Sequence, residues 1–280
     1  MPHQNTVTPE QSELGKKAKY NPYYNPDVLF AIPRQSKRDE IGITGALPFI
    51  GFDIWNHYEV SWLNEKGKPV VAIAELIYPC ESQNIIESKS MKLYFNSFNN
   101  TAFKDIQVLQ ATIANDLSAR VGSPVLVKVT DLMDAKFGRF YAGMEGQCLD
   151  ALDIECSVYM VRSEFLSSEP FVVEETLYSN LLKSNCLVTH QPDWASVQIR
   201  YKGNKINHEG LLKYLVSFRN HNEFHEQCIE RIFVDIMKFC QPEELAVYGR
   251  YTRRGGLDIN AYRGTSNIEP CVGNERLIRQ

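Results

Sequence analysis

Residues 94–100, YFNSFNN, and residues 214–220, YLVSFRN, decide the fold of this chain, because they are two copies of one pattern. The copies lie 120 positions apart and share a tyrosine, a serine, a phenylalanine and an asparagine at the same spacing. Around each copy, apolar alternation gives way to helical periodicity and then returns. We therefore predict a duplicated α+β fold, in which antiparallel sheets are backed by helices.

The apolar patterns predict the elements of the first copy. Alternating and β-rich runs at 57–63 and 70–77 flank the turn sequence EKGKP and indicate a hairpin. Apolar residues at helical spacing predict a helix over 105–120, followed by a strand over 125–129. The motif IIESKS is expected in the loop after the hairpin.

The second copy has a similar series of patterns. We expect a strand over 153–161, then a strand, a Gly203-Asn204 turn and a return strand within 196–206. A row of apolar residues predicts a helix over 223–240, and the run at 245–253 is typical of a strand.

These patterns divide the chain into three segments. Residues 1–50 are rich in proline, asparagine and charge without a sustained period, so we expect an irregular arm. Residues 51–150 form the first module and residues 151–280 the second. The modules differ chemically, which predicts that each holds part of one site and that the site forms where two halves, or two chains, meet.

The composition of the 280 residues is that of a globular protein, with 44% hydrophobic and 23% charged residues and a net charge of -4. That charge disfavours a general nucleic-acid or membrane-surface binder, which normally carries a basic excess. The seven cysteines are odd in number and widely spread, which indicates a reducing compartment. With no apolar run of signal-peptide or membrane-span length, we expect a soluble cytoplasmic protein.

The segment LLKSNCLVTHQPDW, residues 181–194, places a thiol, an imidazole and a carboxylate close together. Cys186 is followed by His190 and Asp193, a composition typical of a reactive site. The alternative is that Cys186 is a small buried hydrophobe, which is the usual state of a lone cysteine.

The sequence NEFHE at 222–226 begins the second predicted helix, where free backbone N–H groups favour carboxylates. Its simplest interpretation is a helix cap with surface charges. A zinc site is an alternative, because His221, His225 and Cys228 are spaced one turn apart. The HExxH order is absent, however, and no CxxC pair completes a tetrahedral set.

Two further motifs carry positive charge. The run from Glu87 to Lys92, ESKSMK, combines two ammonium groups and two hydroxyls with a carboxylate, and can bind a phosphate and a ligand amide, or form a solvated helix start. The run RYTRRGG at 250–256 is the densest basic cluster, and its glycines would let the backbone approach a phosphate. No GxGxxG motif follows a strand, so a Rossmann domain is disfavoured.

The segments IIESKSMKLYFNSFN, LLKSNCLVTHQPDW, SFRNHNEFHEQCIERI and YTRRGGLDIN resemble a known family. They are similar to the long, two-module form of the NADPH-dependent 7-cyano-7-deazaguanine reductases, the nitrile reductases of queuosine biosynthesis, a tRNA modification. The resemblance covers nearly the whole chain. It implies tandem tunnelling-fold modules that associate through sheet edges as a homodimer, and it implies NADPH and 7-cyano-7-deazaguanine as ligands.

The resemblance also implies roles for individual residues. Cys186 matches the covalent nucleophile of the family and Asp193 its proton donor. Five residues match its substrate-binding positions: Ile86, Glu87, Ser88, His225 and Glu226. Four match its NADPH contacts: Ser88, Lys89, Arg254 and Gly255. No metal is implied.

The implied chemistry agrees with these residue types. A nitrile accepts hydride poorly, but addition of the Cys186 thiolate gives a thioimide whose carbon can be attacked. Asp193 would protonate the developing nitrogen anion. Two alternatives remain: a zinc-dependent purine nucleotide cyclohydrolase of the same general fold, and a non-catalytic purine-binding module. Neither explains Cys186, Asp193 and the arginine cluster together.

Overall fold

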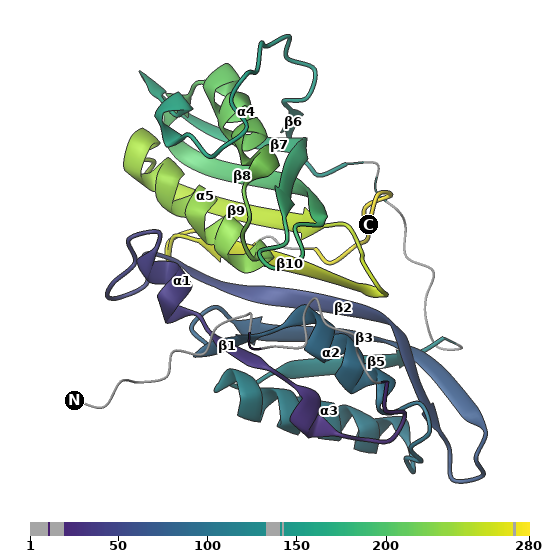
Figure 1. Ribbon diagram of the computed structural model, residues 1–280. Coiled ribbons are helices and arrows are strands. Elements are labelled where there is room, and N and C mark those ends of the chain that lie inside the picture. The colour runs from purple at the N-terminus through teal and green to yellow at the C-terminus, as the bar shows by residue number, and fades with distance from the viewer. Residues whose placement is uncertain (1–10, 12–19, 133–140, 142, 271–272) are drawn as a thin grey trace. The chain divides into compact units, whose positions relative to one another are not determined.

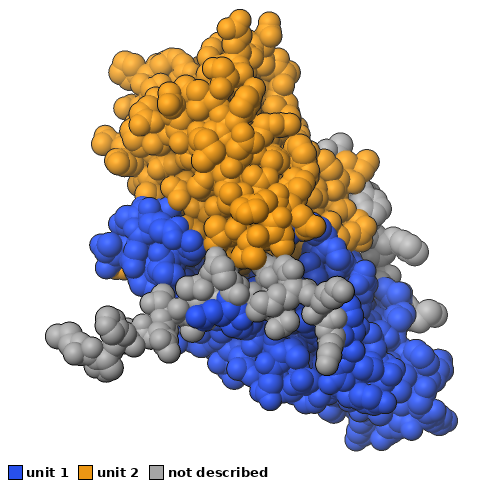
Figure 2. Space-filling view, viewed as in Figure 1, with its two compact units in different colours: residues 1–44, 54–136, 254–257 blue, residues 45–53, 137–253, 258–280 orange. Residues whose placement is uncertain are grey.

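The structure is a computed structural model that describes residues 11, 20–132, 141, 143–270 and 273–280. The chain forms two compact units, shown in blue and orange in Figure 2. Unit 1 consists of residues 1–44, 54–136 and 254–257, and unit 2 of residues 45–53, 137–253 and 258–280. Each unit therefore contains a short segment that interrupts the other unit in the sequence. The division predicted from the sequence, at 50/51 and 150/151, has uninterrupted segments, and it stays a prediction.

Unit 1 is a small antiparallel sheet backed by helices (Figure 1). Its strands follow the order β5-β3-β2, and the short strands β1 and β4 pair separately and antiparallel. The first residues of β2, up to Asp53, belong to unit 2. The elements are β1 (Ala31–Pro33), α1 (Gln35–Asp39), β2 (Ile50–Leu63), β3 (Pro69–Pro79), β4 (Asn84–Ile86), α2 (Ser88–Asn96), α3 (Ile106–Val121) and β5 (Leu126–Asp131).

Helix α3 forms where helical spacing predicted it. The Asp105 side chain accepts a hydrogen bond from Val108 N at 2.8 Å, which caps the first turn, and Gly122 ends the helix with a φ of 72°. Leu109, Ile113 and Leu117 are buried on one face of the helix, which packs along β5. The predicted hairpin is also present as β2 and β3, and the predicted strand after α3 as β5.

The segment predicted as an irregular arm contains regular structure. Strand β1 pairs with β4 through partners such as Ala31 and Ile86, and α1 follows β1 directly. Residues 1–10 and 12–19 of that segment lie outside the described residues.

Unit 2 is a larger sheet with the order β10-β9-β8-β7-β6, in which β6 and β7 pair in parallel and the other strands pair antiparallel. Helices α4 and α5 pack on the sheet, α4 against β7 and α5 against β9 and β8 (Figure 1). The elements are β6 (Gln147–Cys148), β7 (Ser168–Asn185), β8 (Pro192–Ile206), α4 (His208–Ser217), α5 (His225–Cys240), β9 (Glu244–Tyr251) and β10 (Leu257–Gly264).

Helix α5 agrees with the predicted helix over 223–240, apart from its first two residues. Cys228, Ile232, Ile236 and Cys240 are buried, as their spacing of four residues requires for one face of a helix. At Gly249 of β9, an added Cβ atom would lie 2.4 Å from Ile229 Cδ1, so the glycine permits the close approach of this helix to the sheet.

The two copies of the sequence pattern make the same contacts in both units. Tyr94 donates a hydrogen bond to Asp116 at 2.6 Å, and Tyr214 donates one to Asp235 at 2.7 Å. Each serine of the pattern, Ser97 or Ser217, donates to the carbonyl oxygen of its own tyrosine at 2.6 Å. The structure therefore shows the duplication as repeated hydrogen bonds between a helix end and the following long helix.

Two predicted elements of the second half are wrong. Residues 153–161 alternate between exposed and half-buried but form no strand. Residues 203–204 form no turn, because β8 continues through them and pairs Gly203 with Val173 of β7. Pairing with β7 therefore overrides the local turn preference. Gly203 instead permits a close approach of the backbone at Pro242 to β8, since an added Cβ atom would lie 2.8 Å from Pro242 Cα.

A buried ion cluster connects the first residues of β2 to the rest of unit 2. Arg263 of β10 is fully buried and donates to Asp53 at 2.9 Å and to Glu230 of α5 at 2.9 Å. The three members of the cluster therefore come from the three separate segments of unit 2. Among the described residues, no helix is long and apolar enough to cross a membrane.

Candidate active site

Cys186 is the first residue after β7, in the short loop that leads to β8. Its side chain is buried, with 9% of the residue exposed. Cys186 N donates to Gln191 O at 2.8 Å, and His190 N donates to Cys186 O at 3.1 Å. These bonds close a tight loop, in which His190 has a φ of 56° and an exposed side chain. The thiol is therefore held at a fixed place at the end of the hairpin.

Asp193 lies on the same face of the hairpin as Cys186. In the β7–β8 ladder, Asp193 pairs with Ser184, two residues before Cys186. The bond from Cys186 N to Gln191 O continues this ladder, and side chains two positions apart share one face of a strand. Cys186 and Asp193 are thus diagonal neighbours on one face of the hairpin. Asp193 is also buried, with 6% of the residue exposed.

His225, the first residue of α5, contacts Asp193 directly. Its Nε2 lies 3.3 Å from Asp193 Oδ2. The imidazole ring stacks on Tyr251 of β9, with ring centroids 3.8 Å apart and planes 2° from parallel. The stack fixes the plane of the imidazole, which places a proton-carrying group against the carboxylate of Asp193.

The loop and the start of α5 are connected by backbone hydrogen bonds. Asn185 N donates to His221 O at 2.8 Å, and Glu223 N donates to Asn185 O at 3.1 Å. The buried Glu223 accepts two bonds from Arg231 Nε and one from its Nη2, the shortest at 2.6 Å. These contacts hold Cys186 and His225 on adjoining segments.

The three residues that spacing put forward for zinc have different neighbours. His221 Nε2 lies 3.2 Å from Glu223 Oε2, and His225 contacts Asp193 and Tyr251. Burial raises the pKa of the Cys228 thiol well above its usual range. Within the described ranges, no group of three or more His, Cys, Asp or Glu side chains is placed to hold a metal ion.

Glu226, the second residue of α5, is buried with 3% exposed.

In unit 1, Glu87 caps the start of α2 with its side chain. Its two oxygens accept hydrogen bonds from Lys89 N at 2.6 Å and Ser90 N at 2.8 Å. The residue is 1% exposed, and burial raises the pKa of its carboxyl group, against the opposing effect of these bonds. A carboxylate has about four acceptor positions, so Glu87 can still accept bonds from a ligand. Ile86 beside it is buried and Ser88 is half-buried.

The four residues predicted to bind NADPH all lie in unit 1. Ser88 and Lys89 begin α2, and Arg254 and Gly255 belong to the loop between β9 and β10. An added Cβ atom at Gly255 would lie 3.2 Å from the Lys92 side chain, so this loop approaches α2 closely. Tyr58 N donates to Gly256 O at 2.8 Å, which fixes the loop against β2.

Several known proteins that are similar to this chain share one described activity. Residues 20–129 match the family described as "Nitrile reductase, 7-cyano-7-deazaguanine-reductase N-term", and residues 192–269 match the one described as "QueF-like protein". An NADPH-dependent 7-cyano-7-deazaguanine reductase of Legionella pneumophila (strain Corby) is 65% identical over 274 residues, covering 96% of this chain and 95% of that protein. The chain belongs to the family of NADPH-dependent 7-cyano-7-deazaguanine reductases.

Two more distant members support the same assignment to this reductase family. The protein of the same description from Dechloromonas aromatica (strain RCB) is 56% identical over 271 residues, covering 96% of this chain and 95% of that protein. The one from Hydrogenovibrio crunogenus is 54% identical over 277 residues, covering 98% of this chain and 99% of that protein. The family match and the two α+β units confirm the predicted resemblance and the predicted fold class of tandem tunnelling-fold modules.

For a member of this reductase family, the structure groups the predicted site residues by unit. Cys186, Asp193, His225 and Glu226 lie in unit 2, whereas the segment 86–89 and the Arg254-Gly255 pair lie in unit 1. The roles of these residues remain predictions.

Sequence reasoning missed the ring of Tyr251. It also named His190 as the nearby imidazole, although His225 is the histidine that contacts Asp193. No local signal connects residues 225 and 251, because only the packing of α5 on β9 brings them together.

Proposed function

We propose that this chain reduces the nitrile of 7-cyano-7-deazaguanine to the aminomethyl group of 7-aminomethyl-7-deazaguanine, with two NADPH consumed per nitrile. The observation that carries the proposal is the buried Cys186 thiol on the same hairpin face as Asp193, which in turn contacts His225. A nucleophilic thiol beside an acid that a neighbouring base can reprotonate suits covalent addition to a nitrile, in which the nitrogen must gain a proton.

In the proposed first step, Cys186 Sγ, as the thiolate, bonds to the nitrile carbon while Asp193 gives a proton to the nitrile nitrogen. The product is a thioimide, and no electrons leave or enter the substrate. NADPH, when bound, supplies one hydride to this carbon in each of two reductions. Between them, the carbon–sulfur bond breaks, the thiolate of Cys186 is regenerated, and an imine remains for the second reduction. Two hydrides and two protons therefore convert the nitrile to the amine.

His225 is proposed to move protons through Asp193. Its Nε2 lies 3.3 Å from the Asp193 carboxylate, and the stack on Tyr251 keeps the ring in that orientation. A protonated His225 can return a proton to Asp193 after the first step, so Asp193 can act again on the imine nitrogen.

Glu87 and Glu226 are proposed to recognise the base. A deazaguanine presents N1–H and an exocyclic amine, both hydrogen-bond donors, and both carboxyl groups are almost fully buried. A purine without these donors would leave a buried carboxylate poorly paired, at a cost of roughly 1–3 kcal/mol for each. Glu87 belongs to unit 1 and Glu226 belongs to unit 2. Turnover is therefore proposed to need both units.

Lys89, Arg254 and Gly255 are proposed to hold NADPH. The residues present suit its phosphates, because Gly255 and Gly256 have φ values of 59° and 73°, and the loop they form lies against Lys92. Lysine and arginine donors with an exposed glycine backbone form a common setting for phosphate.

Replacement of Arg254 tests this assignment. Arg254→Ala should weaken NADPH binding by about tenfold to a hundredfold, because one charge-assisted contact is worth roughly 1.5–3 kcal/mol. Covalent capture of the nitrile should be unchanged. As a control, Arg120→Ala removes a half-buried arginine of the same unit that none of the proposed NADPH contacts includes, and its Michaelis constant for NADPH should equal that of the wild type. An unchanged Michaelis constant in Arg254→Ala would count against the assignment.

On the basis of the family resemblance, the protein is also proposed to be a homodimer and to be cytoplasmic. It is proposed to act on a small molecule, without a direct nucleic-acid or membrane partner. Light scattering on the purified chain tests the homodimer, and a monomer at assay concentration would contradict it.

The assay for the function itself follows NADPH oxidation by the purified chain. Oxidation should begin only when 7-cyano-7-deazaguanine is added and should stop after about two NADPH per nitrile, which is the stoichiometry that conversion of a nitrile to an amine requires. Ligand binding without NADPH oxidation would indicate a purine-binding module. Metal-dependent turnover of a purine nucleotide without NADPH would indicate a cyclohydrolase.

A further inference from the structure

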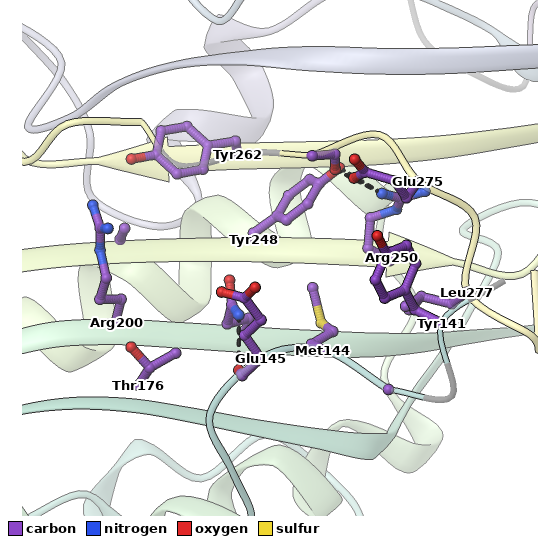
Figure 3. Close-up of a pocket in the computed structure, with 14 residues that line it drawn as sticks. Tyr141, Met144, Glu145, Thr176, Arg200, Tyr248, Arg250, Tyr262, Glu275 and Leu277 are labelled. Atoms are coloured by element: carbon purple, nitrogen blue, oxygen red, sulfur yellow. Dashed lines mark hydrogen bonds between the residues drawn. The ribbon is translucent and has the colours of Figure 1, made fainter. Parts of the chain in front are cut away.

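A cavity of about 370 Å³ lies within unit 2 (Figure 3). Its floor is the face of β7–β10 opposite the helices. On these strands, Gly249 and Arg263 face α5, where they approach Ile229 and Glu230, so their neighbours Tyr248, Arg250 and Tyr262 face the other way. None of the residues assigned above to catalysis, substrate or cofactor lines this cavity.

The floor has two cationic ends with a polar, aromatic middle. Gln198, Tyr248 and Tyr262 lie opposite one another across β8, β9 and β10. Arg200 lies two residues beyond Gln198 in one direction, and Arg250 lies two residues beyond Tyr248 in the other, as Figure 3 shows. Four register positions separate the arginines, or roughly 13 Å, which is about the span of a mononucleotide.

The Arg200 end resembles a phosphate site. Arg200 is half-buried, and Thr176 pairs with it across the β7–β8 ladder, so a guanidinium and a hydroxyl lie side by side. Arg200 Nη2 donates to Glu269 O, which orients the guanidinium. Arginine forks and hydroxyls are common phosphate ligands.

The Arg250 end contains a buried cation. Arg250 is 3% exposed, and its Nη1 donates to Tyr248 Oη and Gly273 O, both at 3.0 Å. Within the part of the chain that the structure describes, these bonds go to a phenol and a carbonyl, and Arg250 Nε has no acceptor. Burial raises the pKa of Tyr248 to about 12, so this phenol stays neutral and does not compensate the charge.

Glu275 lies beside Arg250 in Figure 3, and Glu145 lies near the middle of the floor. Both residues are exposed. A guanidinium next to a carboxylate offers donors beside acceptors. Guanine presents the matching edge, since its O6 and N7 accept bonds from arginine and its N1–H and amine donate to a carboxylate. The rings of Tyr248 and Tyr262 offer apolar surface between the two ends.

We propose that this cavity is a second ligand site that binds a guanine nucleoside monophosphate, with the phosphate at Arg200 and the base at Arg250 and Glu275. Its volume lies within the range of roughly 300–1,000 Å³ that small-molecule pockets have. The exposed carboxylates disfavour polyphosphates and nucleic acid, because additional negative charge would lie close to them.

Isothermal titration calorimetry on the purified full-length chain tests the proposal, with GMP, AMP and inorganic phosphate as probes. GMP should bind, and AMP should bind at least about tenfold more weakly, because its amine replaces the O6 acceptor and it lacks the second amine. Saturating NADPH or 7-cyano-7-deazaguanine should leave GMP binding unchanged. This readout does not depend on catalysis, so failure of the proposed reductase function would leave it intact.

Variants at half-buried or exposed positions assign the two ends while the buried Arg250 stays in place. Arg200→Gln should weaken GMP and phosphate binding by about tenfold to a hundredfold, and Glu275→Gln should weaken GMP binding while leaving phosphate binding unchanged. The matched control is Lys202→Gln, which removes an exposed cation two residues farther along β8, and it should bind GMP within about twofold of the wild type.

Several outcomes would overturn the proposal. These are no heat of GMP binding to the wild type, equal affinity for AMP and GMP, and wild-type binding by Arg200→Gln. Loss of GMP binding in the presence of saturating NADPH would place the nucleotide in the cofactor site instead.

Discussion

At the scale of single residues, burial and contact define the chemistry of this protein more than proximity in sequence does. Cys186 and Asp193 could be predicted because they belong to one hairpin and lie close together in the chain. The place of His225 in the site was predicted only through the family resemblance, and that of Tyr251 was not predicted. The packing of α5 on β9 brings these two residues together beside Asp193. Such contacts have no local signature.

His57 of β2 gives a prediction for pH dependence at this scale. It is 3% exposed, and burial, with a smaller effect of Lys92, lowers its pKa to about 4 from 6.5. The unfolded chain therefore takes up a proton near pH 6.5, whereas the folded chain takes it up only near pH 4. Stability should fall as the pH drops from about 6.5 to about 4, by up to roughly 3 kcal/mol, and then level off.

Urea unfolding of the wild type and of His57→Gln measures this contribution. As the pH falls across that interval, the unfolding free energy of the wild type should fall by more than that of the variant. A difference that is constant from about pH 7 to about pH 4 would show that His57 titrates equally in both states.

At the scale of elements, long periodic segments could be predicted and short ones could not. Helices α3 and α5, each of 16 residues, agree with their apolar spacing within two residues at either end. Helix α4, of 10 residues, was missed, and the start of α2, of 9 residues, was only one of two interpretations of the run at 87–92. So few turns give little periodicity. Strand β8 was interrupted at Gly203 in the prediction, since its pairing with β7 cannot be read locally.

The repeated tyrosine–aspartate contacts differ in one respect that can be measured. Asp235 accepts a bond from Tyr214, whereas Asp116 accepts bonds from both Tyr94 and Tyr24. Tyr214→Phe should therefore lower the unfolding free energy by about 1–3 kcal/mol, because the half-buried Asp235 loses this donor. Tyr94→Phe should cost less than about 1 kcal/mol, since Asp116 keeps Tyr24.

Urea denaturation of the two variants provides the comparison. Equal losses, or a larger loss for Tyr94→Phe, would mean that Tyr24 does not support Asp116 in the folded protein.

At the scale of the whole molecule, the duplication was predicted, but the exchange of segments between the units was not. The segment 45–53 belongs to unit 2 although unit 1 begins before it and resumes after it. The buried Arg263, which contacts Asp53 and Glu230, holds this segment to β10 and α5. Charges placed this far apart in the sequence give no periodic signal, so the ion cluster could not be predicted.

Arg263→Gln should lower the unfolding free energy by about 3–5 kcal/mol, because it leaves two buried carboxylates without their shared cation. The control is Arg120→Gln, which breaks an exposed pair with Asp27 and should cost at most about 1 kcal/mol. Both values come from urea denaturation of the full chain. Similar losses in the two variants would show that the buried cluster contributes no more than a surface pair.

The proposed attack of Cys186 on the nitrile leaves a covalent adduct, which the mass of the intact protein reveals. Incubation with 7-cyano-7-deazaguanine without NADPH should add the mass of one nitrile molecule, since thioimide formation needs no hydride. Cys186→Ala should give no adduct, whereas the control Cys156→Ala, at another thiol, should give the full adduct. Asp193→Ala should slow its formation by roughly 100- to 10,000-fold. An adduct on Cys186→Ala, or none on the wild type, would contradict the account.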